Sequence, residues 1–551
     1  MQYTMPFTLS NFFQVTLHIL LLFSFSSSQT PSDLDTTCSK TLYPSFCKSI
    51  LAENNLQSKT IQDYGHFCLS QSLLMTNNFK LLVNQHLQSS NQNNVSQVTK
   101  FALQDCRSLT SLNIDLLSTT ANMIKPTNNL SSMDIVHVQT MLSAAMTNLD
   151  TCLDGLKEAR PQSSMTQSLS PRISNNTMLL SLSLALFIQG WVPKNNPNDY
   201  LALKYDQIRT RVGNFGNSGS KLQHIGEMMN IIIVNTTVVV NPDGSGDFTT
   251  INDAITAAPI NRMPNTGYYG IYVATGVYQE YINIPSNKKY LLIVGDGINQ
   301  TIITGNRSVG DNSTTYNSAT FAVNGVGFVA TDITIRNIAG AIKHQAVALR
   351  NSADLSAFYR CSFEGYQDTL YAQSMRQFYK ECDIYGTVDF IFGNAAAVFQ
   401  NCNLYARQPL PRQFNLITAQ GRTDPNQNTG FSIQKSMIRA ADDLASSNFT
   451  VETYLGRPWK EYSRTIFMQS FLDNLIQPLG WHEWNGSFAL GTLYYGEYNN
   501  TGLGSNTVNR VTWPGYHVII RTMASYFTVS YFIVGDFWLP STGVPYTLGL
   551  F

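Results

Sequence analysis

Four polar residues fall at intervals that bring their side chains together if the chain coils regularly. Gln345 and Gln367 are about 22 residues apart, and Asp368 and Asp389 are about 21 residues apart, within the range of solenoid repeats. With one coil of that length, they lie on adjacent coils, roughly 4.8 Å apart. Two carboxyl groups and two amides then converge on one face, which is a set suited to nucleophilic and acid–base chemistry.

The neighbours of the two aspartates suggest different protonation states. Asp389 lies between Val388 and Phe390, where an ionised carboxylate is costly unless it is paired. Arg457 is the candidate partner and would keep Asp389 ionised. A second carboxylate nearby raises the pKa of Asp368. The alternative is structural, since buried Asp and Gln also form turns and ladders in β-solenoids.

The elements that would position this set begin near Val238. Short β-rich runs recur from there to the C-terminus, with Gly, Asn and Asp between them and one short helical pattern at 251–258. Their period of about 22 residues predicts a right-handed parallel β-helix over 236–551. The alternative is a β-sandwich, with strands every 8–12 residues.

The region before this one is predicted to be helical. Apolar residues in 138–156 recur every three or four positions, and 61–87, 97–124 and 173–188 show the same pattern. Residues 33–190 are therefore expected to form an all-α four-helix bundle. Residues 191–235, rich in Pro and Gly, are predicted to be a linker.

The N-terminus predicts export from the cell. Residues 15–25 form a short apolar run followed by small residues near Gln29, which is typical of a signal peptide over 1–28. An uncleaved membrane anchor is the alternative. Glycosylation sequons, for example at Asn175 and Asn306, and eight cysteines suit an oxidising compartment.

Composition excludes some classes of function. The chain has 35 Lys+Arg and 35 Asp+Glu among 551 residues, so nucleic acid is not an expected partner. Charged residues make up 13% of the chain against about 25% in typical domains. No cluster of His and Cys suggests a metal site, and no cofactor is expected.

The cysteines suggest several pairings. Cys38 and Cys47 flank a Tyr-Pro turn, and Cys106 and Cys152 fall on separate predicted helices. Cys382 lies about one predicted coil after Cys361 and one before Cys402, so either is placed to pair with it on an adjacent coil.

Several segments resemble the defining blocks of plant pectin methylesterases, in the order of that family. They are QAVAL (345–349), GYQDTLYA (365–372), RQFYKEC (376–382), GTVDFIFGNA (386–395), LGRPWKEYSRT (455–465) and GWHEWNGSFALGTLYYGEY (480–498). The resemblance covers about 236–551. Residues 33–190 resemble the pectin methylesterase inhibitor domain that often precedes the catalytic domain.

The resemblance implies a role for each polar residue. Asp389 is the nucleophile that attacks a methyl ester, and Asp368 is the proton donor and base. Gln345 and Gln367 stabilise the oxyanion, and Arg457 holds Asp389. The family also favours a Cys382–Cys402 disulfide, which leaves Cys361 and Cys68 free.

The implied substrate is methylated homogalacturonan (pectin) of the cell wall, from which the enzyme releases methanol. The substrate-binding residues expected from the resemblance and from the need for aromatic platforms are Thr320, Phe321, Gln345, Tyr371, Phe392, Arg457, Trp459 and Trp481. Inhibitor proteins and a subtilisin-like processing protease are possible partners of such a chain. Residues 219–223 carry one basic residue, Lys221, where family members often have a basic pair for cleavage.

Two other functions compete with this one. A β-helical polygalacturonase also uses paired aspartates, but would shorten the pectin chain. Alternatively, residues 33–190 act mainly as an inhibitor or folding regulator, and the second domain is inert. The complete set of Gln, Asp and Arg residues favours an esterase.

Overall fold

The structure is a computed structural model of the whole chain. It describes residues 33–54, 59–92, 95–125, 130–159, 164–192, 234–448 and 450–551. The predicted signal peptide, most of the predicted linker and Lys221 lie outside the described residues. No helix of the described ranges is long and apolar enough to cross a membrane.

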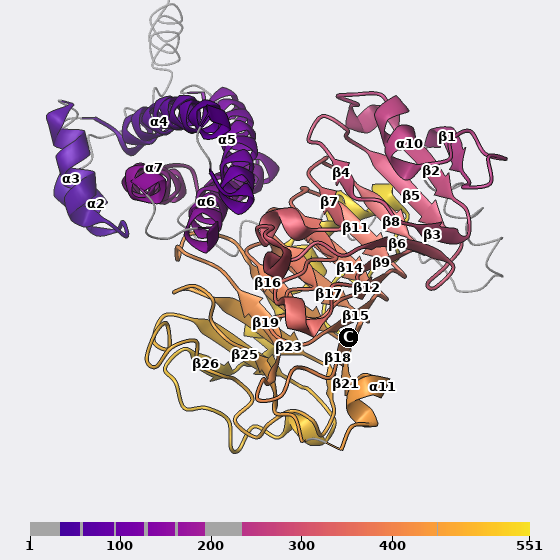
Figure 1. Cartoon of the computed structure of the whole chain (residues 1–551). Helices are drawn as coiled ribbons and strands as arrows, with labels where there is room; N and C mark the ends of the chain where they lie inside the picture. The colour runs from indigo at the N-terminus through magenta and orange to yellow at the C-terminus, as the bar shows by residue number, and fades with distance from the viewer. Residues whose placement is uncertain are drawn as a thin grey trace, which may run out of the picture.

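The N-terminal part is helical (Figure 1). Its helices are α2 (Leu34–Ser39), α3 (Pro44–Glu53), α4 (Ile61–Gln92), α5 (Gln97–Met123), α6 (Ser132–Ala159) and α7 (Ser164–Trp191). The sequence sets where two of them begin, since Thr60 with Asp63 and Ser131 with Asp134 form reciprocal caps before α4 and α6. Helices α4–α7 share one apolar core, as the helical periodicity predicted.

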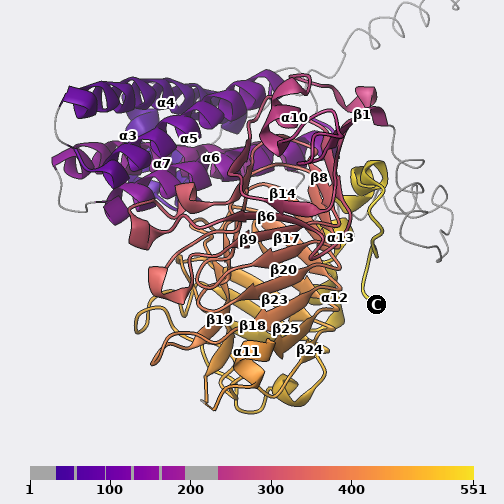
Figure 2. The same ribbon diagram turned by 45° about the vertical axis from the view of Figure 1, so that its right-hand side comes forward.

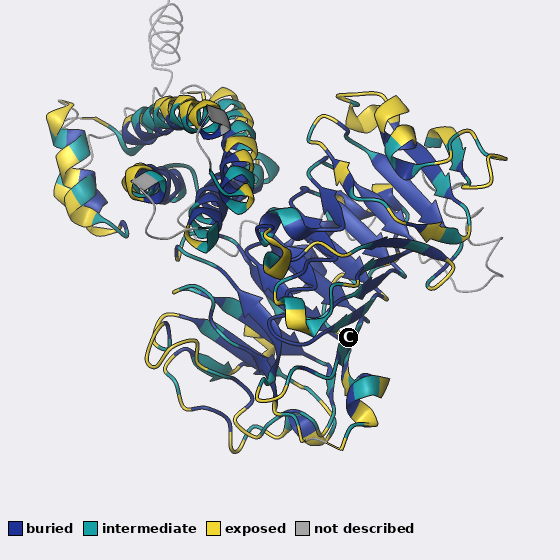
Figure 3. Cartoon of the chain, viewed as in Figure 1, coloured by how far each residue is buried: buried dark blue, intermediate teal, exposed yellow. Residues whose placement is uncertain are grey.

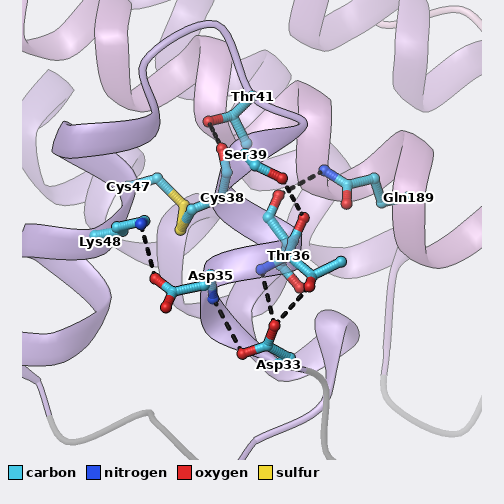
Figure 4. The surroundings of a disulfide bond; sticks show 10 residues. Asp33, Asp35, Thr36, Cys38, Ser39, Thr41, Cys47, Lys48 and Gln189 are labelled. Carbon is cyan, nitrogen blue, oxygen red and sulfur yellow. Dashed lines mark hydrogen bonds and ion pairs between the residues drawn. A yellow bond between two sulfur atoms is a disulfide. The ribbon is translucent and has the colours of Figure 1, made fainter.

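Two disulfides fasten this domain. Cys38–Cys47 joins α2 to α3 and Cys106–Cys152 joins α5 to α6, as predicted. Around the first bond, Asp33 caps α2, Lys48 pairs with Asp35, and Gln189 of α7 donates to the Thr37 carbonyl (Figure 4). The first two contacts lie within the α2–α3 hairpin, and the Gln189 bond links the hairpin to α7 of the bundle.

The second part is a parallel β-helix of three sheets. All of its strand pairs are parallel, and from β2 to β24 successive strands pass through the three sheets in turn. The first sheet contains β1 (Val234–Val240), β2 (Tyr268–Val273), β5 (Leu291–Gly295), β8 (Val329–Thr331), β11 (Ser356–Tyr359), β14 (Arg376–Lys380), β17 (Ala396–Gln400), β20 (Gly430–Gln434), β23 (Arg464–Met468), β25 (Tyr494–Tyr498) and β26 (Tyr516–Val518).

The other two sheets complete each coil. The second contains β4 (Ile282–Ile284), β7 (Phe321–Val323), β10 (Leu349–Asn351), β13 (Leu370–Ala372), β16 (Ile391–Gly393), β19 (Asn415–Gln420) and β22 (Thr453–Gly456). The third contains β3 (Gly276–Tyr278), β6 (Thr301–Gly305), β9 (Thr334–Asn337), β12 (Ser362–Glu364), β15 (Asp383–Gly386), β18 (Asn403–Ala406), β21 (Met437–Ala440) and β24 (Phe471–Leu472). The predicted parallel β-helix is thus confirmed.

Short helices pack against the first coils of the β-helix and along its sides. Helix α10 (Ile251–Ala257) packs near the first coils, and α11 (Asp442–Ala445) follows β21. Near the C-terminus, α12 (Arg521–Ser525) and α13 (Val529–Phe532) contribute to an apolar cluster on the first sheet. Inside the coils the strands are almost wholly buried (Figure 3).

The bends between strands explain the regular period. Arg360, Glu381 and Asn401 stand at the same bend of three successive coils, and each has a positive φ of 49–58°. A single left-handed residue turns the chain sharply without a loop. The coils between β10, β13 and β16 therefore keep the expected period, whereas the coil from β16 to β19 is longer.

The predicted Cys382–Cys402 disulfide is wrong. Cys361, Cys382 and Cys402 are all free and fully buried, and each precedes an in-register strand of the third sheet. Side chains in register on parallel strands stay about 4.8 Å apart, whereas the Cβ atoms of a disulfide are about 3.8 Å apart. Each thiol instead donates to a backbone carbonyl, for example Cys382 to Phe358 at 3.4 Å.

The bundle lies beside the β-helix, and the C-terminal coils continue beyond it (Figures 1 and 2). Helix α6 supplies many of the contacts. For example, Asn148 accepts a hydrogen bond from Gln373 at 3.0 Å, and Thr147 accepts one from Asn394 at 2.8 Å. This contact surface includes the candidate site.

Candidate active site

Asp368 and Asp389 occupy equivalent places on adjacent coils. Each lies shortly before a strand of the second sheet, β13 or β16, and these two strands pair in register. Both aspartates have a positive φ, 63° and 51°, a conformation that Asp tolerates better than most residues. The Asp368 amide donates to the Val388 carbonyl at 3.1 Å. The coil therefore holds both carboxyl groups at one corner.

Arg457, which lies on a later coil, forms an ion pair with Asp389. It comes directly after β22, and its amide donates to the Thr418 carbonyl of β19 at 3.0 Å. Its Nε and NH2 groups donate to the two oxygens of Asp389 at 2.9 and 2.6 Å. Such a two-point bond fixes the orientation of the carboxylate and stabilises its charge.

The environments of the two carboxyl groups differ. Burial raises the pKa of Asp389, but the charge and hydrogen bonds of Arg457 oppose that rise. For Asp368, burial is joined by the nearby Asp389 and Glu158 charges, so its pKa lies well above the usual range. As pH rises, Asp389 therefore loses its proton first, and Asp368 remains a proton donor.

A cavity of about 390 Å³ opens over this pair. Gln345 and Gln367 line it together with Asp368, Asp389 and Arg457. The predicted polar set is thus brought together in one place, with two amides beside the buried carboxyl groups. Amide N–H groups in such a position can donate to a developing oxyanion.

One wall of the cavity is aromatic. Tyr371 and Phe392 pair across β13 and β16 and stack with their ring centroids 4.2 Å apart. Trp459 meets both rings edge-on, at 6.5 and 5.8 Å. These three of the five predicted aromatic residues line the cavity and form a surface on which a sugar ring can rest.

Three predicted binding residues lie elsewhere. Phe321 and Trp481 are buried in the core of the β-helix, where the Trp481 indole donates to Glu497 at 3.3 Å. Thr320 is also fully buried, and its hydroxyl donates to the Arg336 carbonyl at 3.1 Å. These side chains are core residues and are not exposed to the cavity.

The sequence analysis missed several lining residues. Trp484 lines the cavity and is 37% exposed, and the Arg457 guanidinium lies 4.3 Å from its ring centre. Trp484 stood in the same sequence block as Trp481, and only the structure separates the core ring from the exposed one. Tyr316 and Thr315 also line the cavity.

Four further missed residues belong to the helical domain. Thr151, Asp154, Gly155 and Glu158 of α6 line the cavity. The Thr151 hydroxyl lies 3.2 Å from the Tyr371 hydroxyl, and Glu158 accepts hydrogen bonds from the amide and hydroxyl of Thr315 at 2.9 and 2.6 Å. Helix α6 therefore forms one side of the cavity.

Known families match both parts of the chain. The family described as Pectinesterase matches residues 237–536, and the family described as Plant invertase/pectin methylesterase inhibitor matches residues 32–186. Probable pectinesterase/pectinesterase inhibitor 41 of Arabidopsis thaliana is 51% identical, over 94% of this chain and 95% of its own. Pectinesterase 2 of Citrus sinensis is 46% identical, over 96% and 98%.

A solved structure agrees with these matches. The pectin methylesterase from carrot is 55% identical, with a TM-score of 0.56, and 98% of its chain corresponds to 57% of this one. Nearly all of that protein thus matches a length close to that of the β-helix part, so the solved carrot protein has its fold without a helical domain of this kind. The chain belongs to the pectinesterase family and carries an N-terminal domain of the pectin methylesterase inhibitor family.

Proposed function

We propose that the β-helix hydrolyses the methyl esters of homogalacturonan, releasing methanol, with Asp389 as nucleophile and Asp368 as acid and base. The observation that carries the proposal is the pairing of an arginine-bound carboxylate with a buried carboxyl group of higher pKa in one cavity. The Citrus sinensis relative is named as a pectinesterase, and the Arabidopsis thaliana relative as a probable pectinesterase/pectinesterase inhibitor.

The reaction follows from the placement of these groups. Asp389 attacks the ester carbonyl carbon, and amides of Gln345 and Gln367 donate to the oxyanion. When the intermediate collapses, the methoxy group leaves and takes the proton of Asp368 as methanol. Asp368 then removes a proton from water, the hydroxide attacks the acyl carbon, and Asp389 is released as a carboxylate. One ester and one water give one acid and one methanol.

Methanol release from highly methylated pectin tests this proposal. The chain of residues 234–551 is compared with Asp389→Asn and Asp368→Asn, and the length of the pectin is followed in the same samples. We expect both variants to lose at least about 1,000-fold in kcat while pectin length stays constant. Shortening of the pectin would indicate a glycosidase instead.

We further propose that helix α6 blocks the cavity in the intact chain. Its Thr151, Asp154 and Glu158 side chains line the cavity, next to the Tyr371 hydroxyl and the paired carboxyl groups. A polymer cannot enter a site filled in this way, so the intact chain should release methanol far more slowly than residues 234–551. Equal rates would contradict the block.

Export to the cell wall is part of the same proposal. Two disulfides in the helical domain suit an oxidising compartment, and pectin is found outside the cell. Detection of the chain in the wall fraction of expressing tissue, with its N-terminus near Gln29, would support secretion. Retention inside the cell would contradict it.

A further inference from the structure

Helix α6 presents three carboxyl groups in a row to the β-helix. Asp150, Asp154 and Glu158 recur at every fourth position, so they lie on one face at a spacing of about 6 Å. Each meets a different polar group of the β-helix, namely the hydroxyl of Thr423, the ammonium of Lys460, and the amide and hydroxyl of Thr315. The surface beneath α6 therefore binds a row of three carboxyl groups, and it meets the middle one, Asp154, with an ammonium.

Lys460 is the cation in this row. Its Nζ donates to both oxygens of Asp154 at 2.9 and 2.8 Å and lies 4.9 Å from the ring centre of Trp459, a member of the aromatic wall. Asp154 itself lines the cavity with Asp368 and Asp389. The ammonium thus stands at the edge of the cavity, next to a surface suited to sugar rings.

Lys460 and Arg457 differ in which domain supplies their ion-pair partner. Arg457 forms an ion pair with Asp389 of the same domain, so its positive charge is already neutralised within the site. The partner of Lys460 belongs to the helical domain and leaves with it. With α6 away, the ammonium is free to pair with another anion, and an unesterified galacturonate unit carries a carboxylate of the same kind.

We propose that Lys460 binds the free carboxylate of a galacturonate unit next to the methyl ester held at Asp389, and that Asp154 imitates this carboxylate. Lys460 then determines specificity, because it favours partly de-esterified chains over fully methylated ones. The inference rests on the proposed esterase function and adds a substrate preference to it.

The test uses residues 234–551 with two homogalacturonans of equal length, one fully methylated and one about half methylated. Lys460→Gln is compared with Lys460→Arg, and Lys435→Gln, an exposed lysine on another bend, is the control. The measured quantity is kcat/KM on the half-methylated chain divided by kcat/KM on the fully methylated one.

We expect Lys460→Gln to lower this ratio about fivefold through KM, Lys460→Arg to retain most of it, and Lys435→Gln to leave it unchanged. Added salt should lower the ratio in the wild type more than in Lys460→Gln. A ratio unaffected by Lys460→Gln would overturn the proposal. Absence of methanol from both substrates with the wild type would instead reject the esterase function itself.

Discussion

At the scale of single residues, the site depends on a difference in pKa between two similar side chains, Asp368 and Asp389. Asp368 and Asp389 share a backbone conformation and a register position. Arg457 makes the difference, since it donates two hydrogen bonds to Asp389. Two neighbouring buried carboxyl groups resist ionising together, so the arginine decides which one carries the charge.

Replacing Arg457 by Lys should therefore impair both rate and pH response. A lysine cannot donate to both oxygens in one plane, so the pKa of Asp389 should rise further. The reaction needs Asp389 ionised, and the acidic limb of the pH profile of kcat/KM should move to higher pH, with a loss of about 100-fold at the optimum.

The measurement is methanol release by residues 234–551 across the pH range. Arg439→Lys is the matched control, because Arg439 lies on the third sheet beside the Phe471 ring, in the coils beyond the site. An acidic limb that stays in place despite a lower rate would mean that Arg457 does not set the ionisation of Asp389.

Spacing predicted the polar residues of the site better than the aromatic ones. When carboxyl or amide groups recur once per coil, their side chains lie close together, and they form either a site or a hydrogen-bonded ladder. Aromatic rings are equally common in the core of a β-helix and in a sugar-binding cleft, so residue type alone does not distinguish the two places. The strands show no simple alternation, since Phe321, Ala322 and Val323 of β7 are all buried. Phe321 and Trp481 could therefore not be assigned to a face from sequence.

At the scale of elements, each coil fixes the position of the next. Cys361, Cys382 and Cys402 form a ladder because β12, β15 and β18 are in register. Burial raises the pKa of Cys382 well above its usual value, so its thiol stays protonated and unreactive. The sequence separation of Cys382 and Cys402 showed that they would be neighbours, but neighbours in register do not meet the geometry of a disulfide.

The number of free thiols checks this ladder. Eight cysteines and two disulfides leave four thiols, on Cys68, Cys361, Cys382 and Cys402. A thiol reagent added to the chain unfolded without reductant should therefore titrate four groups, and reductant should raise the count to eight. Two groups before reduction would mean that a third disulfide exists and would contradict the ladder of free thiols.

Helix α6 is the element that joins the two domains at the site. Asp154→Lys would place an ammonium against Lys460, where a 2.8 Å ion pair now stands, and like charges so close repel. We expect this substitution to raise methanol release by the intact chain at least about tenfold, as the helix moves away from the cavity.

Asp115→Lys is the matched control, because Asp115 is an exposed residue of α5. Methanol release by residues 234–551, which lack α6, gives the upper limit for the increase. An intact Asp154→Lys chain no more active than the wild type would show that the Lys460 contact does not hold the cavity closed.

At the scale of the whole molecule, the two folds were predictable and their docking was not. The helical periodicity of α6 predicted a helix with one apolar face, because packing within the bundle requires it. The polar residues of α6 that touch the β-helix resemble any solvent-exposed set in sequence. Their role depends on a surface formed by residues 314–316, 371–373 and 423–460, which are distant in the chain.

The docking surface buries carboxyl groups, and this makes it sensitive to pH. Burial raises the pKa of Asp105 to about 7 and that of Asp150 to about 6, against the hydrogen bonds from Thr314 and Thr423. The pKa of Glu158 is raised as well, again mainly by burial. In the separated domains these groups would face water and titrate near 4.

A raised pKa in the docked state means that docking favours the protonated groups. Their contribution is complete below about pH 4 and is lost as pH rises through about 6 to 7. The intact chain should therefore be closed in acid and open near neutrality. Between about pH 4.5 and 7.5 its methanol release should rise at least about tenfold more than that of residues 234–551.

The double variant Asp105→Asn with Asp150→Asn isolates the cause. Asparagine keeps the shape and the ability to bond Thr314 and Thr423 but cannot ionise, so the intact variant should stay closed, and nearly inactive, at about pH 7.5. Asp115→Asn, on the exposed face of α5, should behave as the wild type. If the intact chain and residues 234–551 gave parallel pH profiles, the buried carboxyl groups would not govern the opening, and the closed state would have to depend on apolar and neutral polar contacts alone.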